Sequence, residues 1–326
     1  MTRIAPTNAK GTRDYLPRDL VRRNRVFTLL REMFERYGFE PLETPAVENT
    51  VVLEGKYGAE GEKLLFRILK RGQDLEQAAA KLGAGPTGQG AEGAATAGAL
   101  SRLLSDEALR YDLTVPFARV IAAHQNELTF PFRRYQMQPV WRAERPQRGR
   151  FREFYQCDVD CVGSASVTVE AEMLAMVNEV FARLGFADFT MRINHRKLLT
   201  ALLESEGVPQ NQQTGVLVAI DKLDKIGVAG VREELEKTGV APEIAERLLQ
   251  AISITGTPEE VVRQLREQTR LGDSPTGSAA LADLSDFFGY LAAMNVPPQR
   301  YAFDISTVRG LSYYTGIIFE VHVAGA

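Results

Sequence analysis

Residues 132–162 decide the fold of this chain, and they read FRRYQMQPVWRAERPQRGRFREFYQCDVDCV. Two runs rich in aromatic and apolar residues, 132–142 and 152–162, flank a polar loop at 143–151. Paired runs of this kind around a loop predict a β-hairpin. Because side chains alternate between the two faces of a strand, one face of the second strand carries Arg152, Phe154, Gln156, Asp158 and Asp160.

The polar face of this predicted hairpin concentrates groups that bind small anions and polar ligands. Arg142, Gln156 and Asp160 share that face, and Arg150 and Arg152 lie at its turn end. A guanidinium group binds phosphate through two parallel hydrogen bonds, and a glutamine and an aspartate four residues apart suit a small ligand lying across the strands. A solvated face with weak surface ion pairs explains the same pattern, so the residues alone leave both interpretations open.

The sequence on either side of the hairpin alternates predicted helices and strands. Apolar residues spaced three and four apart predict a helix over 18–37, which Gly38 ends. Helical patterns dominate residues 196–294. The remaining predicted elements are an extended stretch at 39–42, a helix at 167–184 and strands at 301–305 and 316–323. The simplest interpretation is an α+β fold in which a helical unit interrupts a β-rich one.

A segment rich in glycine and alanine, residues 83–99, is predicted to be a flexible insertion. It contains too little apolar surface to order itself. Gly83, Gly85 and Gly88 match the G-x-G-x-x-G pattern of dinucleotide-binding sites. That pattern binds a nucleotide only between a strand and a helix, whereas residues 75–82 before it are helix-like. We therefore expect no nucleotide site there.

Composition narrows the class of protein. The 326 residues exceed one average domain, which predicts two units, and a net charge of −3 argues against a surface built for nucleic acid. We expect no membrane span and no signal peptide, and hence a cytoplasmic protein. If Cys157 and Cys161 lie on one strand, they are about 13 Å apart and cannot form a disulfide. Three histidines form no ligand cluster, so no metal ligands are assigned.

Two further segments combine residues that bind ligands. The segment 304–316 places Arg309 beside Gly310 and follows them with Tyr313 and Tyr314, and the segment 109–116 carries Asp112 and Thr114. An arginine next to a glycine can approach an anion closely, and tyrosine hydroxyls can orient a substrate. The same residues also have a purely structural explanation, in which the glycines shape turns and the tyrosines cap a core.

In this order, the segments resemble the catalytic part of histidyl-tRNA synthetases. The stretch 142–156 is similar to that family's second class II motif, and 308–316 resembles its histidine-specific motif, with Ser312 where the family usually has Asp. Residues 10–17 resemble its N-terminal signature, and the helix leading to Pro45 resembles the first class II motif. The resemblance covers residues 8–70 and 104–323, and the 83–99 insertion has no counterpart in it.

The resemblance implies a class II synthetase-type antiparallel sheet flanked by helices, with a helical insertion domain. The implied catalytic domain spans 1–193 and carries the flexible insertion at about 73–104. The implied helical insertion domain spans 194–300, and the chain returns to the catalytic domain at 301–326. The chain ends before the third class II motif, so we expect either a fragment or a protein that lacks this motif and the anticodon-binding domain.

The resemblance also implies an activity and roles for individual residues. A homodimer would activate L-histidine with ATP and Mg²⁺ to histidyl-adenylate and then transfer the histidyl group to tRNA(His). The implied catalytic residues, which stabilise charge at the α-phosphate, are Arg142 and Arg309. The implied ATP-binding residues are Arg142, Glu144, Arg150 and Phe154. The implied histidine-binding residues are Asp112, Thr114, Arg142, Gln156, Asp160, Arg309, Tyr313 and Tyr314.

Two other classes of function compete with this one. A synthetase-like regulatory subunit of histidine biosynthesis, a partner of ATP phosphoribosyltransferase, would share the fold without aminoacylation. Such paralogues tend to lose the second-motif arginine and its loop, whereas Arg142, Glu144, Arg145 and Arg150 are all present here. A general nucleic-acid-binding module is disfavoured by the net charge of −3.

Overall fold

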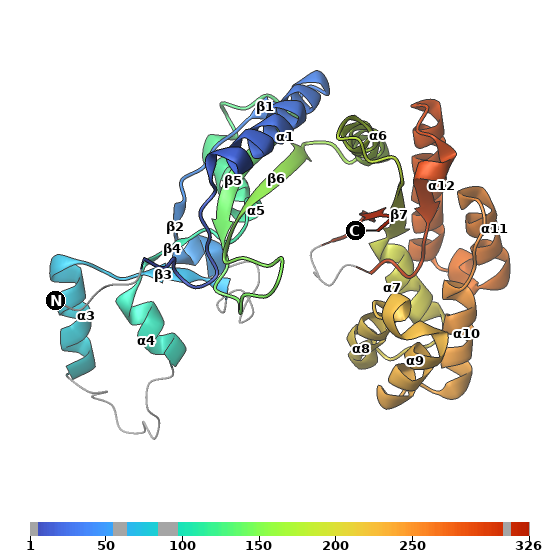
Figure 1. The fold of residues 1–326 in the computed structure, drawn as a ribbon. Coiled ribbons are helices and arrows are strands. Elements are labelled where there is room, and N and C mark those ends of the chain that lie inside the picture. Colours follow the sequence, from blue (N-terminus) through green and yellow to red (C-terminus); the bar gives the residue numbers. More distant parts are fainter. Residues whose placement is uncertain (1–5, 55–63, 84–96, 309–313, 326) are drawn as a thin grey trace. The chain divides into compact units, whose positions relative to one another are not determined.

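The computed structural model describes residues 6–54, 64–83, 97–308 and 314–325. The chain divides into two compact units, Met1–Ser164 and Ala165–Ala326. Each unit has its own sheet or sheets and its own core, and each is described by itself (Figure 1).

A β-hairpin forms the centre of the first unit, as the sequence predicts. Strand β5 (Phe132–Trp141) pairs antiparallel with β6 (Glu153–Val162), in a register that runs from Phe132 opposite Val162 to Trp141 opposite Glu153. The short strand β1 (Glu40–Pro41) pairs parallel with β5, so the sheet order is β1-β5-β6.

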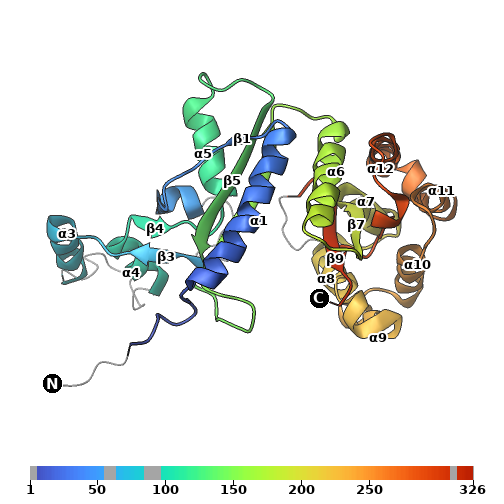
Figure 2. The same ribbon diagram turned by 45° about the horizontal axis from the view of Figure 1, so that its top comes forward.

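Two helices cover opposite faces of this hairpin (Figures 1 and 2). Helix α1 (Pro17–Arg36) confirms the predicted helix, and Gly38 follows it with a φ of 77°. Its Phe34 ring lies 5.4 Å from the Tyr135 ring. Helix α5 (Thr114–His124) contacts the other face, where the Phe117 and Phe132 rings are 6.3 Å apart. Because Phe132 and Tyr135 are three residues apart on a strand, their side chains point to opposite faces.

A second small sheet completes the first unit. Strand β4 (Glu107–Leu109) lies between β2 (Val47–Asn49) and β3 (Phe66–Ile68), and both pairings are antiparallel. A cluster of buried side chains packs around this sheet, namely Leu53, Leu65, Ala108, Tyr111 and Val115.

Two helices lie where the sequence predicts a flexible insertion over about 73–104, centred on 83–99. Helices α3 (Gly72–Gly83) and α4 (Ala97–Leu104) occupy the two ends and contact each other. Alanine favours helix, and Leu100, Leu103 and Leu104 give α4 the spacing of an amphipathic helix despite the local glycines. Residues 84–96 lie outside the described part of the chain.

The second unit packs helices on a three-stranded sheet. Strand β7 (Phe189–His195) pairs parallel with β8 (Tyr301–Phe303) and antiparallel with β9 (Ile317–Val323). Helix α6 (Val167–Arg183) precedes β7. The helices between β7 and β8 are α7 (Arg196–Ser205), α8 (Gln210–Ile220), α9 (Leu223–Lys237), α10 (Pro242–Ile252), α11 (Pro258–Gln268) and α12 (Pro275–Ala293), with short 3₁₀ turns η1 (Arg270–Asp273) and η2 (Pro298–Arg300).

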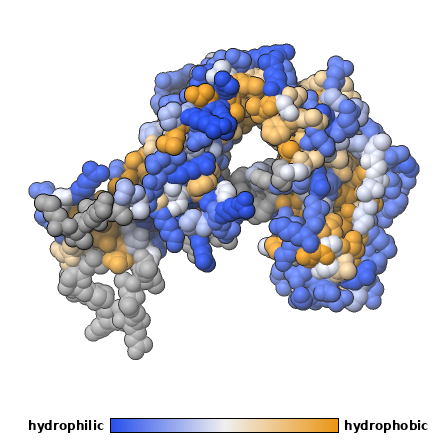
Figure 3. Space-filling model, viewed as in Figure 1, coloured by the Kyte–Doolittle hydropathy of each residue, from blue (hydrophilic) through white to orange (hydrophobic). Residues whose placement is uncertain are grey.

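Leucine, valine and phenylalanine side chains from these helices and from β7 form one continuous core. Figure 3 shows hydrophilic residues along the outer edge of the second unit and hydrophobic residues between the helices. The element order confirms the predicted helix at 167–184, the helical stretch 196–294 and the return to strands. The α+β class is therefore confirmed, with parallel pairs at β1–β5 and β7–β8 among mainly antiparallel sheets. The assignment of α7–α12 to a separate insertion domain stays a prediction.

Candidate active site

The register of the hairpin brings the predicted ligand-binding residues onto one face. Gln138 lies opposite Gln156, and Arg134 lies opposite Asp160. Since residues directly opposite each other in a sheet point to the same side, the four side chains share a face with Phe154. This face is not simply solvated, because the segment from Arg110 to Phe117 and the turn at Thr44 pack over it.

A pocket at the turn end of the hairpin brings together all four predicted ATP-binding residues. Its volume is about 400 Å³, and it is lined by Arg142, Glu144, Gly149, Arg150, Phe151 and Phe154. The Arg142 Nε donates a hydrogen bond of 3.0 Å to the Tyr111 carbonyl oxygen, and its guanidinium carbon lies 5.1 Å from the centre of the Phe154 ring. Two arginines and two half-buried phenylalanines, Phe151 and Phe154, therefore line one hollow.

The loop that shapes this pocket is a tight turn. Gln147 and Arg150 exchange main-chain hydrogen bonds of 3.2 and 2.9 Å, and Gly149 between them has a φ of 79°, a conformation that favours glycine. The Arg152 Nε donates to the Glu144 carbonyl oxygen at 3.0 Å. These contacts fix the main chain on both sides of Arg150.

Asp112 and Thr114 lie where strand β4 leads into helix α5. The Asp112 side chain is buried, and its Oδ1 accepts a hydrogen bond of 3.0 Å from the Val115 N–H, which caps the first turn of α5. Thr114 is the first residue of that helix. One oxygen of Asp112 thus has a structural role, and the arginines and carboxylates of β5 and β6 lie nearby.

Asp160 and Gln156 occupy the polar face of β6. The Asp160 Oδ2 is 2.7 Å from the Arg134 Nη2, in an ion pair in which Arg134 is fully buried and Asp160 is 29% exposed. The Gln156 Oε1 is buried and accepts no hydrogen bond from the residues that the structure describes. A buried amide oxygen of this kind is available to a donor on a ligand.

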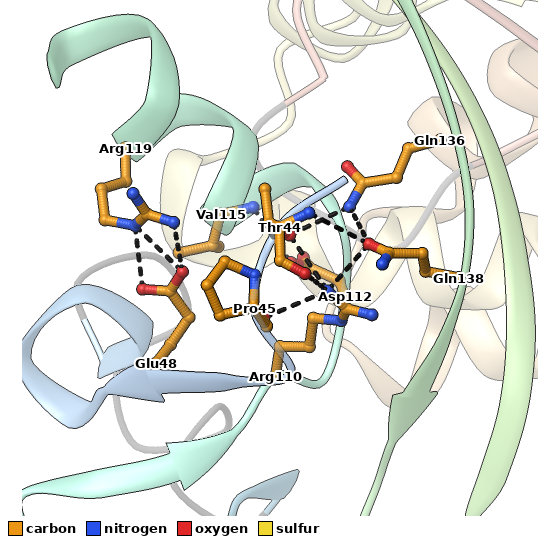
Figure 4. Close-up of polar contacts among 9 residues, drawn as sticks. All are labelled: Thr44, Pro45, Glu48, Arg110, Asp112, Val115, Arg119, Gln136 and Gln138. Atoms are coloured by element: carbon orange, nitrogen blue, oxygen red, sulfur yellow. Dashed lines mark hydrogen bonds and ion pairs between the residues drawn. The ribbon is translucent and has the colours of Figure 1, made fainter. Parts of the chain in front are cut away.

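A network of buried polar side chains supports the site, and the sequence analysis missed it. Arg110 is 1% exposed. Its Nη1 donates to the Thr44 Oγ1 and the Gln138 Oε1, both at 3.0 Å (Figure 4). Its Nη2 donates to the Pro139 carbonyl oxygen at 3.0 Å. Gln136 is also fully buried and donates to the Thr44 Oγ1 at 2.9 Å. The network ties the turn at Thr44 to strand β5.

A second contact in Figure 4 joins helix α5 to strand β2. Arg119 binds the buried carboxylate of Glu48 through Nε and Nη2, with N–O distances of 2.6–3.0 Å. The alternation of Arg134, Gln136 and Gln138 along β5 is the signal that could have predicted a polar inner face.

Burial shapes the charge of the site. Burial lowers the pKa of Arg134 from its ordinary value, and the carboxylates of Asp160, Asp158 and Asp112 oppose that change. Burial likewise lowers the pKa of Arg110, against Glu43 and Glu48. Because an arginine starts from a pKa far above neutrality, positive charge on this face balances the predicted histidine-binding carboxylates.

The predicted residues of the second unit are only partly described. Tyr314 is half-buried and packs against the core of that unit. Arg309, Ser312 and Tyr313 lie outside the described residues, so the structure does not test the predicted roles of Arg309 and Tyr313. In the described ranges, no group of three or more His, Cys, Asp or Glu residues could hold a metal ion, and no helix is long and apolar enough to cross a membrane.

Comparison with known proteins points to one family. A family model described as histidyl-tRNA synthetase matches residues 102–326. A histidine–tRNA ligase of Christiangramia forsetii is 42% identical over 97% of this chain and 67% of its own length. One from Gloeobacter violaceus is 42% identical over 95% of this chain and 64% of its own length. The chain thus spans about two thirds of the length of these relatives.

Solved structures show the same similarity. Histidyl-tRNA synthetase from Nostoc sp. PCC 7120 superimposes with a TM-score of 0.82 at 32% identity, over 99% of this chain and 66% of that one. A Bacillus halodurans protein described as an ATP phosphoribosyltransferase regulatory subunit/histidyl-tRNA synthetase gives a TM-score of 0.77 at 20% identity, over 100% and 74%. At 20% identity, the second comparison shows a shared fold alone.

Proposed function

Because the chain belongs to the histidyl-tRNA synthetase family, whose curated relatives are histidine–tRNA ligases, we propose that it activates L-histidine with ATP for transfer to tRNA(His). The observation that supports this best is the layout of the hairpin. A pocket with two arginines and Phe154 lies at its turn end, and Gln156 and Asp160 follow along the same face. A nucleotide and an amino acid could therefore bind side by side.

In this proposal ATP occupies the pocket of about 400 Å³. Phe154 offers the adenine ring an aromatic surface, while Arg142 and Arg150 bind the phosphates. Mg²⁺ would arrive with ATP as part of the substrate, since it commonly keeps its waters and binds through phosphates and only one or two carboxylates. Glu144 is the carboxylate that lines the pocket.

Histidine would bind along the polar face of β6. Its ammonium group and its imidazole N–H are donors that match the carboxylates of Asp112 and Asp160 and the amide oxygen of Gln156. Thr114 lies beside Asp112 at the start of α5. Arg309, Tyr313 and Tyr314 are proposed to complete the histidine site, and for all three this rests on the family resemblance alone.

The reaction joins these two substrates. An oxygen of the histidine carboxylate bonds to the α-phosphorus of ATP, the bond from that phosphorus to the oxygen that bridges to the β-phosphate breaks, and pyrophosphate leaves. Arg142, held by the Tyr111 carbonyl oxygen, places positive charge where negative charge develops, and Arg309 is proposed to do the same. A hydroxyl oxygen of tRNA(His) then bonds to the histidyl carbonyl carbon, the bond from that carbon to the phosphate oxygen breaks, and AMP leaves.

Further proposals concern the whole protein. We propose that the protein is cytoplasmic, because aminoacyl-tRNA is consumed where ribosomes translate. We propose in addition that it forms a homodimer. We also propose that α7–α12 form the helical insertion domain of 194–300, between the catalytic segments 1–193 and 301–326. A regulatory subunit without aminoacylation is less well supported, since Arg142, Glu144 and Arg150 are all present and line one pocket.

A crossed pair of variants tests the proposal. By calorimetry, Gln156→Ala should weaken L-histidine binding by about 1–3 kcal/mol, because a buried hydrogen bond to the ligand is lost. ATP affinity should stay within about twofold of the unaltered chain. Phe154→Ala should weaken ATP binding and leave L-histidine affinity nearly unchanged. Each variant therefore serves as the control for the other. Equal affinity for histidine and leucine, or a loss of both ligands in both variants, would contradict the assignment.

A further inference from the structure

The fully buried Arg134 joins two segments that the proposed function assigns to histidine. Its Nη2 pairs with the Asp160 Oδ2 at 2.7 Å on one side. The same nitrogen donates to the Leu113 carbonyl oxygen at 3.4 Å on the other, and Leu113 lies between Asp112 and Thr114. One guanidinium group therefore links strand β6 to the start of helix α5.

The orientation of this guanidinium group is set by packing. Its central carbon lies 4.4 Å from the centre of the Phe117 ring, so the cation rests on an aromatic face of helix α5. Arg134 stands on the middle strand of its sheet, where neighbours on both sides restrict movement. The side chain is thus held before any ligand arrives.

Stability alone does not explain an arginine at this position. The Nε and Nη1 of Arg134 have no hydrogen-bond acceptor among the described residues. Burying a cation with unmet donors disfavours folding, and an apolar residue of similar volume is often as stable or more so. Arg110 is the contrast, because its Nε and Nη2 both donate to the Pro139 carbonyl oxygen, at 3.1 and 3.0 Å, and its Nη1 is also bonded.

We propose that Arg134 is a positioning residue for histidine binding. It fixes the Asp160 carboxylate and the main chain at Leu113 as one unit, and thereby sets the spacing at which Asp112, Thr114 and Asp160 meet the amino acid. This inference rests on the proposed function. Arg134 itself does not touch the substrate and acts through Asp160 and the 112–114 segment.

A double-mutant cycle in the chain tests whether Arg134 acts through Asp160. By calorimetry, Arg134→Met should weaken L-histidine binding by about 10–100-fold, in line with the loss of one charge-assisted contact that orients a ligand group. ATP affinity should change less than about threefold, because the nucleotide pocket lies at the other end of the hairpin. In an Asp160→Asn background, the further loss caused by Arg134→Met should fall below about threefold.

Arg119→Met is a matched control. It also removes a charge-paired arginine, one that lies on α5 itself, but its partner is Glu48 and not a proposed site residue. We expect this control to lower the melting temperature while the ratio of histidine to ATP affinity stays unchanged. Arg134→Met should show the opposite pattern, with a melting temperature within about 5 °C of the unaltered chain.

The outcomes separate this inference from the proposed function. If the unaltered chain does not bind histidine, the proposed function fails first. If the unaltered chain binds histidine, two results would show that the positioning role is wrong. One is that Arg134→Met lowers histidine affinity and ATP affinity equally. The other is that Arg134→Met lowers histidine affinity as much in the Asp160→Asn background as with Asp160 in place. Should Arg134→Met not fold, Arg134→Lys keeps the charge but shortens the reach, and it must still show the selective loss for histidine.

Discussion

At the scale of single residues, His195 makes the stability of the second unit depend on pH. The imidazole is 2% exposed, and its Nδ1 accepts a hydrogen bond of 3.2 Å from the Lys197 N–H, which caps helix α7. Burial lowers the pKa of His195 from its ordinary value of 6.5, although Asp283 opposes this change. A protonated ring has no lone pair at Nδ1, so protonation also removes the cap.

The sign of the pH effect follows from that direction. A pKa that is lower in the folded state means that the unfolded state binds the proton more readily. The stabilising effect is therefore complete above about pH 6.5 and is lost as the pH falls through the folded-state pKa. Urea unfolding should show a loss of about 1 kcal/mol or more in acid, and His195→Asn, which keeps a capping side chain, should flatten this dependence. If the pH dependence of His195→Asn ran parallel to that of the unaltered chain, the prediction would be wrong.

The sequence indicates candidate ligand-binding residues more readily than the residues that support them. Arg142, Gln156 and Asp160 could be proposed because polar side chains alternate along a strand that should otherwise bury apolar ones. Arg110 and Arg134 could not be assigned, because a buried arginine is recognised by its partners. Those partners, Thr44 and Pro139 for Arg110 and Leu113 for Arg134, lie far from it in the sequence.

At the scale of elements, Gly277 sets how closely helix α12 approaches the preceding turn. A Cβ at this position would lie 2.3 Å from the Leu271 carbonyl oxygen, and Leu271 is itself fully buried in η1. Gly277→Ala should therefore destabilise the protein by about 1–3 kcal/mol or more, measured by urea unfolding, because main-chain atoms cannot easily move aside. Gly289→Ala in the same helix meets no atom within 4 Å and should gain up to about 1 kcal/mol. Equal effects at both glycines would exclude this close contact as the cause.

Helices and the hairpin could be predicted because their signals are local. The breaks at Gly207, Gly239 and Gly256 each carry a positive φ, as glycine permits, and separate consecutive helices. Helix α4 was missed because its neighbours resemble a flexible linker in composition, although its own leucines have helical spacing. The glycine- and alanine-rich composition of residues 83–99 thus concealed the helical spacing of the three leucines in α4.

At the scale of the whole molecule, pairing between distant strands limits what a sequence can reveal. Strand β7 pairs with β8 and β9, although six helices separate β7 from β8 in the chain. The two compact units divide between Ser164 and Ala165, inside the short run of small residues 163–166, which is too brief to stand out as a linker in the sequence. Length alone predicts two units, while the domain limits at 193 and 300 remain predictions.

The proposed homodimer gives the last prediction. Helix α1 buries Met33 and Phe34 on its inner side but leaves Val21 and Val26 exposed, with Val21 at 54%, and Leu16 just before the helix is exposed as well. Exposed apolar residues along one helix favour an interface, and the family's first motif includes this helix. Light scattering at tens of micromolar should give twice the chain mass of 36.1 kDa.

Val21→Glu should weaken association by about 30-fold or more, because a charge would be buried without a partner. Val218→Glu on α8, a valine of similar exposure at 52%, is the matched control and should leave the dimer intact. A monomeric unaltered chain, or equal effects of the two glutamates, would mean that α1 does not form the interface.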